Sequence, residues 1–137
     1  MQNKSNNELI LIRGVPGSGK TTKAKKEYPN HVLYEADQYF TDLKGNYVFD
    51  PKKIQDAHKW CQAKAKMSLN AGKNVVVANT FTRIWEMKPY LMMAKRLGCQ
   101  VKVIEATGNY KNVHGVPDEK VEQMRERFEN FTDNQFS

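Results

Sequence analysis

The chain has few cysteines and no long apolar segment. Its 137 residues include two cysteines, Cys61 and Cys99, which lie far apart and form no C-x-x-C pair. This spacing indicates neither a disulfide framework nor a cysteine metal site. No run of apolar residues approaches the roughly 20 that a membrane-spanning helix needs, or resembles the apolar region of a secretory signal. We therefore expect a cytoplasmic protein with no membrane partner.

Acidic residues are also in the minority. Asp and Glu number 15 against 22 Lys and Arg, which gives a formal net charge of +7. This balance suits phosphate-rich partners such as ATP and nucleic acid, but it identifies neither, because many basic proteins bind no nucleic acid. The sequence has no internal repeat, linker or low-complexity tract. Its length and uniformity predict a single domain over residues 1–137.

A glycine-rich stretch follows the first apolar run. Residues 14–21 read Gly-Val-Pro-Gly-Ser-Gly-Lys-Thr and fit the phosphate-binding loop pattern G-x-x-x-x-G-K-[ST]. The apolar run before it, residues 9–12, predicts a buried parallel strand, and the residues after Lys20 can continue as a helix. We favour nucleotide binding over an ordinary glycine-rich turn because a strand and a helix flank the motif on the expected sides.

Each fixed position of this loop has a chemical role. Glycines let the backbone turn tightly and bring N–H groups to phosphate oxygens, and the following helix adds its unpaired N–H groups and dipole. Lys20 is predicted to reach the β- and γ-phosphates of ATP, and the Thr21 hydroxyl to bind Mg²⁺. With ATP and Mg²⁺ as predicted cofactors, the predicted cofactor-binding residues are Gly14, Pro16, Gly17, Ser18, Gly19, Lys20, Thr21 and Thr22.

Short apolar segments alternate with helical patterns along the rest of the chain. The further predicted strands are residues 31–35, 74–78 and 101–104. The predicted helices start after Lys20, at Asp50-Pro51, near Thr82 or Pro89, and at Pro117. Side chains expected to pack inside include Trp60, Trp85, Met87, Met92 and Met93. Strands that alternate with helices predict an α/β fold, a P-loop NTPase with three α/β/α layers and a parallel sheet of four or five strands.

Ligands bind such sheets at the carboxyl ends of the strands. Asp37 follows the second strand, so its carboxylate can accept a proton from an attacking hydroxyl and help hold the water shell of Mg²⁺. The alternative for Asp37 is to cap a turn. Asn79 and Thr80 follow the third strand and are either substrate contacts or turn residues. Arg83 comes next, either as a contact for substrate phosphates or as part of a solvated helix surface.

Several further motifs accompany the phosphate loop. They are Asp37-Gln38-Tyr39-Phe40, Ala57-His58-Lys59-Trp60-Cys61, Asn79-Thr80, Trp85-Glu86-Met87-Lys88-Pro89-Tyr90 and His114-Gly115-Val116-Pro117. With these motifs the chain resembles the P-loop kinase domain of phage polynucleotide 5′-hydroxyl kinases. It resembles still more closely the related predicted-kinase domain of phages and of some large animal nucleic-acid-processing proteins. The resemblance runs over residues 9–129.

The resemblance implies a role for most of these residues. Lys20 and Thr21 would bind ATP and Mg²⁺, and Asp37 would be the general base for the acceptor hydroxyl. The sheet would have the strand order 2-3-1-4, and a short mobile lid over residues 106–116 would close the site with Lys111. The expected catalytic residues are Lys20, Asp37, Arg83 and Lys111, and the expected metal-binding residues are Thr21 and Asp37. The expected substrate-binding residues are Asp37, Tyr39, Phe40, Asn79, Thr80 and Arg83.

The chain departs from the family pattern at three places. Phe40 stands where the polynucleotide kinases have an acceptor-binding arginine, although the closer relatives also carry phenylalanine. Ala78 stands where the relatives have an aspartate after the third strand. The lid is shorter than theirs and carries Lys111 in place of an arginine. These departures bear on acceptor identity, metal affinity and catalytic rate respectively.

The residues and the resemblance together predict an ATP-dependent phosphotransferase. We expect it to move the γ-phosphate to a hydroxyl, with the 5′-hydroxyl of RNA or DNA as the favoured acceptor and a nucleic-acid 5′ end as the partner. A small-molecule kinase of the same fold, acting on a nucleoside or another metabolite, is one alternative. A nucleotide-binding module with little catalysis, acting through a partner, is the other. The sequence leaves the choice between DNA and RNA and the oligomeric state open.

Overall fold

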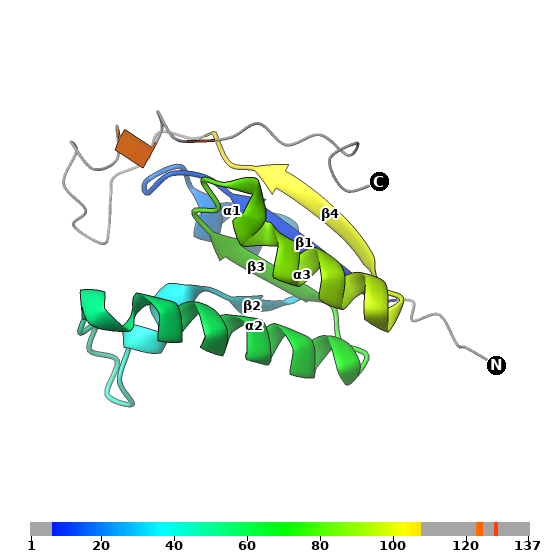
Figure 1. Cartoon of the computed structure of the whole chain (residues 1–137), viewed down its shortest axis with the longest axis horizontal. Coiled ribbons are helices and arrows are strands. Elements are labelled where there is room, and N and C mark those ends of the chain that lie inside the picture. Colours follow the sequence, from blue (N-terminus) through cyan, green and yellow to red (C-terminus); the bar gives the residue numbers. More distant parts are fainter. Residues whose placement is uncertain (1–6, 108–122, 125–127, 129–137) are drawn as a thin grey trace.

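A computed structural model describes residues 7–107, together with residues 123, 124 and 128 (Figure 1). In chain order its elements are β1 (Glu8–Arg13), α1 (Lys20–Glu27), β2 (Val32–Tyr34), η1 (Ala36–Phe40), η2 (Pro51–Lys53), α2 (Ile54–Asn70), β3 (Val75–Asn79), α3 (Ile84–Leu97) and β4 (Gln100–Glu105). The four strands are parallel and lie in the order β2-β3-β1-β4. The α/β fold and the strand order 2-3-1-4 are thus confirmed. The predicted lid beyond residue 107 and most of the predicted last helix lie outside the described residues.

The central strand β1 is apolar throughout because both faces of the sheet are covered. Leu9 and Leu11 face a large core under α2 and α3, whereas Ile10 and Ile12 face a smaller core under α1. All four side chains are fully buried. This alternation of two buried faces explains why a parallel strand appears in the sequence as a continuous apolar run.

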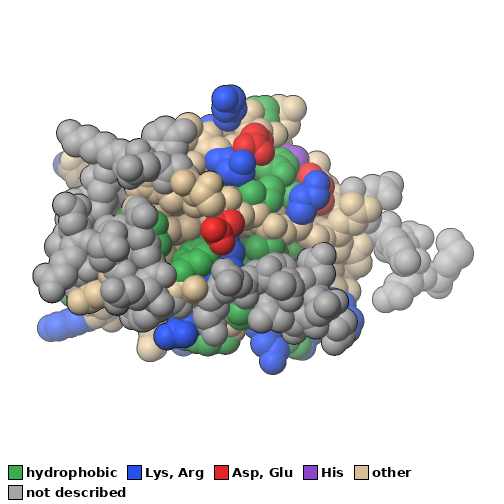
Figure 2. Space-filling view, turned by 90° about the horizontal axis from the view of Figure 1, so that it is seen from above, with side chains coloured by type: hydrophobic (Ala, Val, Ile, Leu, Met, Phe, Trp, Pro, Cys, Tyr) green, Lys and Arg blue, Asp and Glu red, His purple; other side chains and the backbone are tan. Residues whose placement is uncertain are grey.

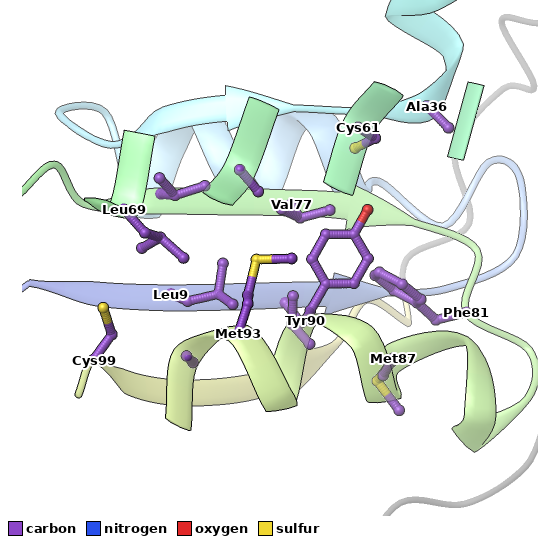
Figure 3. Packing of buried hydrophobic residues seen from close by; sticks show 14 of the residues in the cluster. Leu9, Ala36, Cys61, Leu69, Val77, Phe81, Met87, Tyr90, Met93 and Cys99 are labelled. Carbon is purple, nitrogen blue, oxygen red and sulfur yellow. The ribbon is translucent and has the colours of Figure 1, made fainter. Parts of the chain in front are cut away.

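The larger core joins two helices to one face of the sheet. Figure 3 shows Tyr90 and Met93 of α3 pointing toward the strands, while Cys61 and Leu69 come from α2 on the other side of the cluster. Burial raises the pKa of the Cys61 thiol. The small buried residues of α2, which include Ala57 and Ala65, let this helix lie close against the sheet.

Local signals set the ends of the helices. The Asp50 side chain accepts a hydrogen bond from the Lys52 N–H (3.0 Å), and Pro51 follows it, so a 3₁₀ turn leads into α2. The helix α3 begins at Ile84, where the Glu86 carboxylate accepts hydrogen bonds from the Arg83 N–H (2.8 Å) and the Thr82 hydroxyl (2.9 Å). Pro89 lies inside α3 and does not mark its start.

Two side chains that were predicted to pack inside are exposed. Met87 and Met93 of α3 are buried, but Trp85 is 71% exposed and Met92 is 44% exposed. The reason is geometric, because the face of α3 that contacts the sheet carries Met87, Tyr90 and Ala94, and Trp85 and Met92 lie on another face. The first residue of α2, Ile54, is also exposed, since it precedes the part of the helix that covers the sheet.

The strand β4 forms an edge of the sheet, and its side chains are largely exposed or half-buried. Figure 2 shows charged side chains of both signs among hydrophobic ones on the upper side of the molecule as drawn in Figure 1. Lys102 and Glu105 place charges on this edge, which discourages pairing with another chain. Within the described residues, no helix combines the length and apolar character needed to cross a bilayer.

The buried central strand supports a direct stability test. Leu11→Ala removes a fully buried side chain and should lower the free energy of unfolding by about 2–5 kcal/mol. Leu43→Ala is the matched control, because the Leu43 side chain is fully exposed, and it should change the free energy by less than about 0.5 kcal/mol. Urea unfolding followed by circular dichroism measures both. Equal stability of the two variants would contradict the assignment of β1 to the core.

Candidate active site

The phosphate loop connects β1 to α1 at the carboxyl edge of the sheet (Figure 1). A Cβ atom on Gly14 would lie 2.3 Å from the Ser18 Oγ and 2.8 Å from the Ala106 carbonyl oxygen, so only glycine fits there. The Gly14 N–H donates to the Thr80 carbonyl (3.1 Å), which fixes the loop against the end of β3. Gly19, the residue before α1, has a φ of 88°, a conformation that glycine adopts without strain.

The loop presents polar groups that a phosphate can use. The Ser18 hydroxyl is buried and has no hydrogen-bond partner among the described residues. The Lys20 ammonium donates to the Val15 carbonyl (3.2 Å) and so lies folded over the loop. Burial lowers the pKa of Lys20, while the carboxylates of Glu35 and Asp37 partly offset this effect. An orphaned hydroxyl and a half-buried ammonium at the start of a helix fit a bound phosphate.

Glu35 is a site residue that sequence reasoning missed. The Thr21 hydroxyl donates a hydrogen bond to the Glu35 carboxylate. Since the hydroxyl proton is held by Glu35, the lone pairs of the Thr21 oxygen are left for a cation. The one available signal was an acid at the end of the second apolar run, one residue after Tyr34. No group of three His, Cys, Asp or Glu side chains in the described residues forms a metal site by itself. A magnesium ion here would therefore also need oxygens from the nucleotide.

Asp37 lies on η1, directly after the end of β2. The Tyr47 hydroxyl donates a hydrogen bond to the Asp37 Oδ1 (3.2 Å). Burial, together with the charge of Asp37, raises the pKa of Tyr47 to about 12. The phenol therefore keeps its proton at neutral pH and remains a donor to Asp37. Sequence reasoning gave Tyr47 no role.

A turn after η1 carries Tyr47 to Asp37. Thr41 and Tyr47 form an antiparallel bridge, and the Asp42 side chain accepts hydrogen bonds from the N–H groups of Lys44 (2.9 Å) and Asn46 (2.8 Å). Gly45 completes the turn with a φ of 85°. The short Lys44-Gly45-Asn46 sequence thus determines which aromatic side chain reaches the carboxylate.

Tyr47, the hydrogen-bond partner of Asp37, belongs to an aromatic cluster. The rings of Phe40 and Phe49 lie 5.0 Å apart, those of Tyr47 and Phe49 stack at 6.5 Å, and Tyr39 lies 6.1 Å from Trp60 of α2. Phe40 is buried at the centre of the cluster and is placed to pack, not to face solvent. Tyr39, Tyr47 and Phe49 are each at least 37% exposed and present ring surface beside Asp37.

Asn79 at the end of β3 and Thr80 after it support the site through hydrogen bonds to backbone groups. Asn79 is buried, and its side-chain oxygen accepts from the Ala36 N–H (2.8 Å) while its amide nitrogen lies 3.8 Å from the Cys61 sulfur. These bonds position the turn that carries Asp37, so the geometry favours a positioning role over direct substrate contact. Thr80 is half-buried and holds Gly14 through its carbonyl. Arg83 is exposed at the start of α3, and Lys111 lies outside the described residues.

A buried arginine holds the backbone that follows β3. Arg13, the last residue of β1, is 1% exposed and donates through Nε (3.1 Å) and Nη2 (2.7 Å) to the Phe81 carbonyl. Its guanidinium lies 4.0 Å from the centre of the Phe128 ring. Phe81 has a φ of 48°, and the paired hydrogen bonds from Arg13 hold this unusual conformation. Sequence reasoning gave Arg13 no role.

Known proteins share this arrangement of strand, loop and helix. The chain is 34% identical to human NEDD4-binding protein 2 over an alignment of 136 residues, which covers 90% of the chain and 8% of that protein. It superposes on a chain of the Pnkp1/Rnl/Hen1 complex with a TM-score of 0.62 and 19% identity, over 99% of this chain and 44% of that one. The APS kinase CysC of Mycobacterium tuberculosis gives a TM-score of 0.53 and 12% identity, over 91% and 99%.

The two structural likenesses show a shared P-loop kinase-like fold, consistent with three α/β/α layers. The chain itself spans less than half of the first of these structures and 8% of the human relative. The sequence profile of the AAA domain family matches residues 9–108, which is most of the chain. The protein therefore belongs to the AAA domain family.

Proposed function

We propose that the protein transfers the γ-phosphate of ATP to a hydroxyl group, and that the acceptor is the 5′-hydroxyl of RNA or DNA. The observation that carries this proposal is the meeting of a phosphate loop and a carboxylate at one edge of the sheet. Lys20 and Thr21 lie at the start of α1, and Asp37 lies on η1. The charge of Asp37 acts on Lys20 and raises its pKa against the effect of burial.

The loop and the following helix bind the phosphates of ATP. The backbone N–H groups and the Ser18 hydroxyl meet the phosphate oxygens, and Lys20 exchanges its bond to the Val15 carbonyl for one to the β- and γ-phosphates. Thr21 and the carboxylates of Glu35 and Asp37 would hold Mg²⁺, which supplies neutralisation of the phosphate charge when bound. Glu35 compensates in this arrangement for Ala78, which offers no carboxylate.

Asp37 acts as the general base. It accepts the proton of the acceptor hydroxyl while the acceptor oxygen bonds to the γ-phosphorus and the bond from that phosphorus to the bridging oxygen of ADP breaks. Tyr47 donates to the Oδ1 of Asp37 and so orients the carboxylate for the acceptor. Catalysis in this mechanism consists of positioning and charge neutralisation.

Three features support a nucleic-acid acceptor over a small metabolite. Exposed rings of Tyr39, Tyr47 and Phe49 offer stacking surfaces for a base next to Asp37. The net charge of +7 favours a polyanion. One structure with this fold is described as an RNA repair complex. Arg83, and Lys111 if a lid forms as predicted, are the further candidates to stabilise the charge on the transferred group.

Nucleotide binding should depend on the Lys20 ammonium. Lys20→Ala removes the charged donor and should weaken ATP binding by about 2 kcal/mol or more, because hydrogen bonds to charged groups are worth more than neutral ones. Lys26→Ala is the matched control, since Lys26 is an exposed lysine at the end of the same helix. Isothermal titration calorimetry measures both, with circular dichroism to check folding. Equal affinity of the two variants would exclude the loop as the ATP site.

Transfer of labelled γ-phosphate tests the acceptor and the base together. The wild type should phosphorylate 5′-hydroxyl oligonucleotides and leave a panel of nucleosides and sugars unlabelled. Asp37→Asn should keep ATP binding and lose roughly 10²–10⁴-fold in transfer, the usual share of general base catalysis. Full transfer by Asp37→Asn would make Asp37 structural. Transfer to a nucleoside or sugar alone would replace the polynucleotide by a small-molecule acceptor, and slow ATP turnover that no acceptor changes would indicate a nucleotide-binding module.

Glu35 should matter for the cation and not for the nucleotide. Glu35→Gln should reduce the affinity of the ATP complex for Mn²⁺, used as a paramagnetic substitute for Mg²⁺, by roughly 10-fold or more, in line with the loss of a group that orients a metal ligand. ATP binding measured without divalent cations should stay the same. Glu27→Gln, a change of the same kind on the exposed end of α1, should alter neither quantity. Unchanged Mn²⁺ affinity in Glu35→Gln would remove Glu35 from the site.

A further inference from the structure

A second candidate binding site lies between α2 and α3, on the face of the molecule that both helices cover. The two helices leave a groove with a volume of about 680 Å³ between them. Its walls carry Lys59 and Lys66 from α2 and Lys88 and Arg96 from α3. The exposed side chains of Trp85 and Met92 also line it.

The sequence spacing explains why these residues share a groove. Lys59 and Lys66 are seven residues apart on α2, and Trp85, Lys88, Met92 and Arg96 follow one another on α3 at intervals of three or four residues. Such intervals place side chains on one face of a helix. The described residues that line the groove include no aspartate or glutamate, so its charge is positive throughout.

The groove begins near the catalytic edge and leads away from it. Both α2 and α3 start at the carboxyl edge of the sheet and run toward the opposite edge (Figure 1). Trp85 therefore lies at the end near the phosphate loop, and Arg96 lies at the far end. At a rise of about 1.5 Å per residue, the distance along α3 between them is about 16 Å. This is the length of roughly five stacked nucleotides at about 3.4 Å each.

The aromatic cluster connects the groove to Asp37. The ring of Tyr39, two residues after Asp37, lies 6.1 Å from the ring of Trp60. Trp60 follows Lys59, the first groove lysine of α2, in the sequence. A strand whose 5′ end lies at Asp37 therefore meets rings first, and the cations of the groove begin on the same helix as Trp60.

We propose that this groove binds the part of a single-stranded nucleic acid that follows its 5′ end. The four cations meet phosphates, and Trp85 offers an exposed ring, 71% accessible, on which a base can stack. An acidic amphipathic helix from another protein would also match the charge. The start of both helices at the catalytic edge and the exposed indole favour the nucleic acid. The inference rests on the proposed function, because it assigns the path of that same substrate.

Charge reversal at the far end of the groove tests the proposal without touching the catalytic edge. The groove variant is Lys66→Glu with Arg96→Glu, and the matched control is Lys64→Glu with Lys95→Glu, which changes the net charge equally on the same two helices outside the groove. Fluorescence anisotropy measures the binding of a 3′-labelled 5′-hydroxyl strand of about 12 nucleotides. The groove variant should lose about 10-fold or more in affinity and show a flatter salt dependence, by about 1.4 in the slope of log K against log salt. The control should lose much less.

Trp85→Ala provides a second and independent measurement. It should weaken binding of the same strand by about 10-fold, the usual share of one stacked base, and Trp85→Phe should restore most of the affinity. In transfer assays the groove variant should lower kcat/KM for the long strand and leave that for a dinucleotide acceptor unchanged. Thermal unfolding verifies that each variant is folded.

Two results would overturn the proposal. One is equal strand affinity in the groove variant and its control, and the other is an unchanged affinity in Trp85→Ala. If an acidic amphipathic peptide then binds the wild type and loses affinity in the groove variant alone, the groove is a protein-docking surface. Absence of phosphate transfer to any acceptor would instead refute the proposed function, while the anisotropy measurements would still decide whether the groove binds a strand.

Discussion

The backbone at Arg13 and Gly14 is the constraint on which the rest of the structure depends. The Gly14 N–H donates to the Thr80 carbonyl (3.1 Å), and the Arg13 carbonyl accepts from the Ala106 N–H (2.7 Å), so the ends of β1, β3 and β4 are held together. Gly14 also has no space for a side chain, because the Ala106 carbonyl and the Ser18 hydroxyl lie against it. The phosphate loop can curve where it does because the strand ends are fixed at these two residues. Everything proposed for this edge requires that geometry.

The sequence predicts an element of the fold correctly where a short motif or an unbroken apolar run identifies that element. The phosphate loop is fixed by its glycines and lysine, and β1 is identified by four consecutive apolar residues. The strand order came from the resemblance and not from pattern, since hydrophobicity does not say which strands are neighbours. Glu35, Tyr47 and Arg13 were missed for a different reason. Their roles depend on which distant group each side chain meets, and a strand end or turn in the sequence does not specify that. Trp85 was misjudged because the buried face of α3 is defined only once α2 and the sheet are in place.

The acidic groups of the proposed site lie beyond the end of β2, whereas position 78 on β3 carries alanine. Ala78 is nearly fully buried in the small core under α1, where a carboxylate would need a charged partner. Glu35 comes from the end of the neighbouring strand β2 and reaches the Thr21 hydroxyl from a partly exposed position. A carboxylate at that place stays partly exposed to solvent and is attracted by the charge of Lys20, so its charge costs less to maintain than one at position 78 would.

The same helix direction explains why the site and the groove belong to one surface. In a parallel sheet every connecting helix starts near the carboxyl edge, so α2 and α3 both run away from the phosphate loop and lie nearly side by side. The residues of the larger core lie on one face of each helix. The four cations of the groove lie on other faces of the same two helices. A ligand that is held at Asp37 and is longer than one nucleotide can follow this surface. Of the described residues, those between α2 and α3 combine an apolar floor with positive charge on both walls, the two properties that bases and phosphates require.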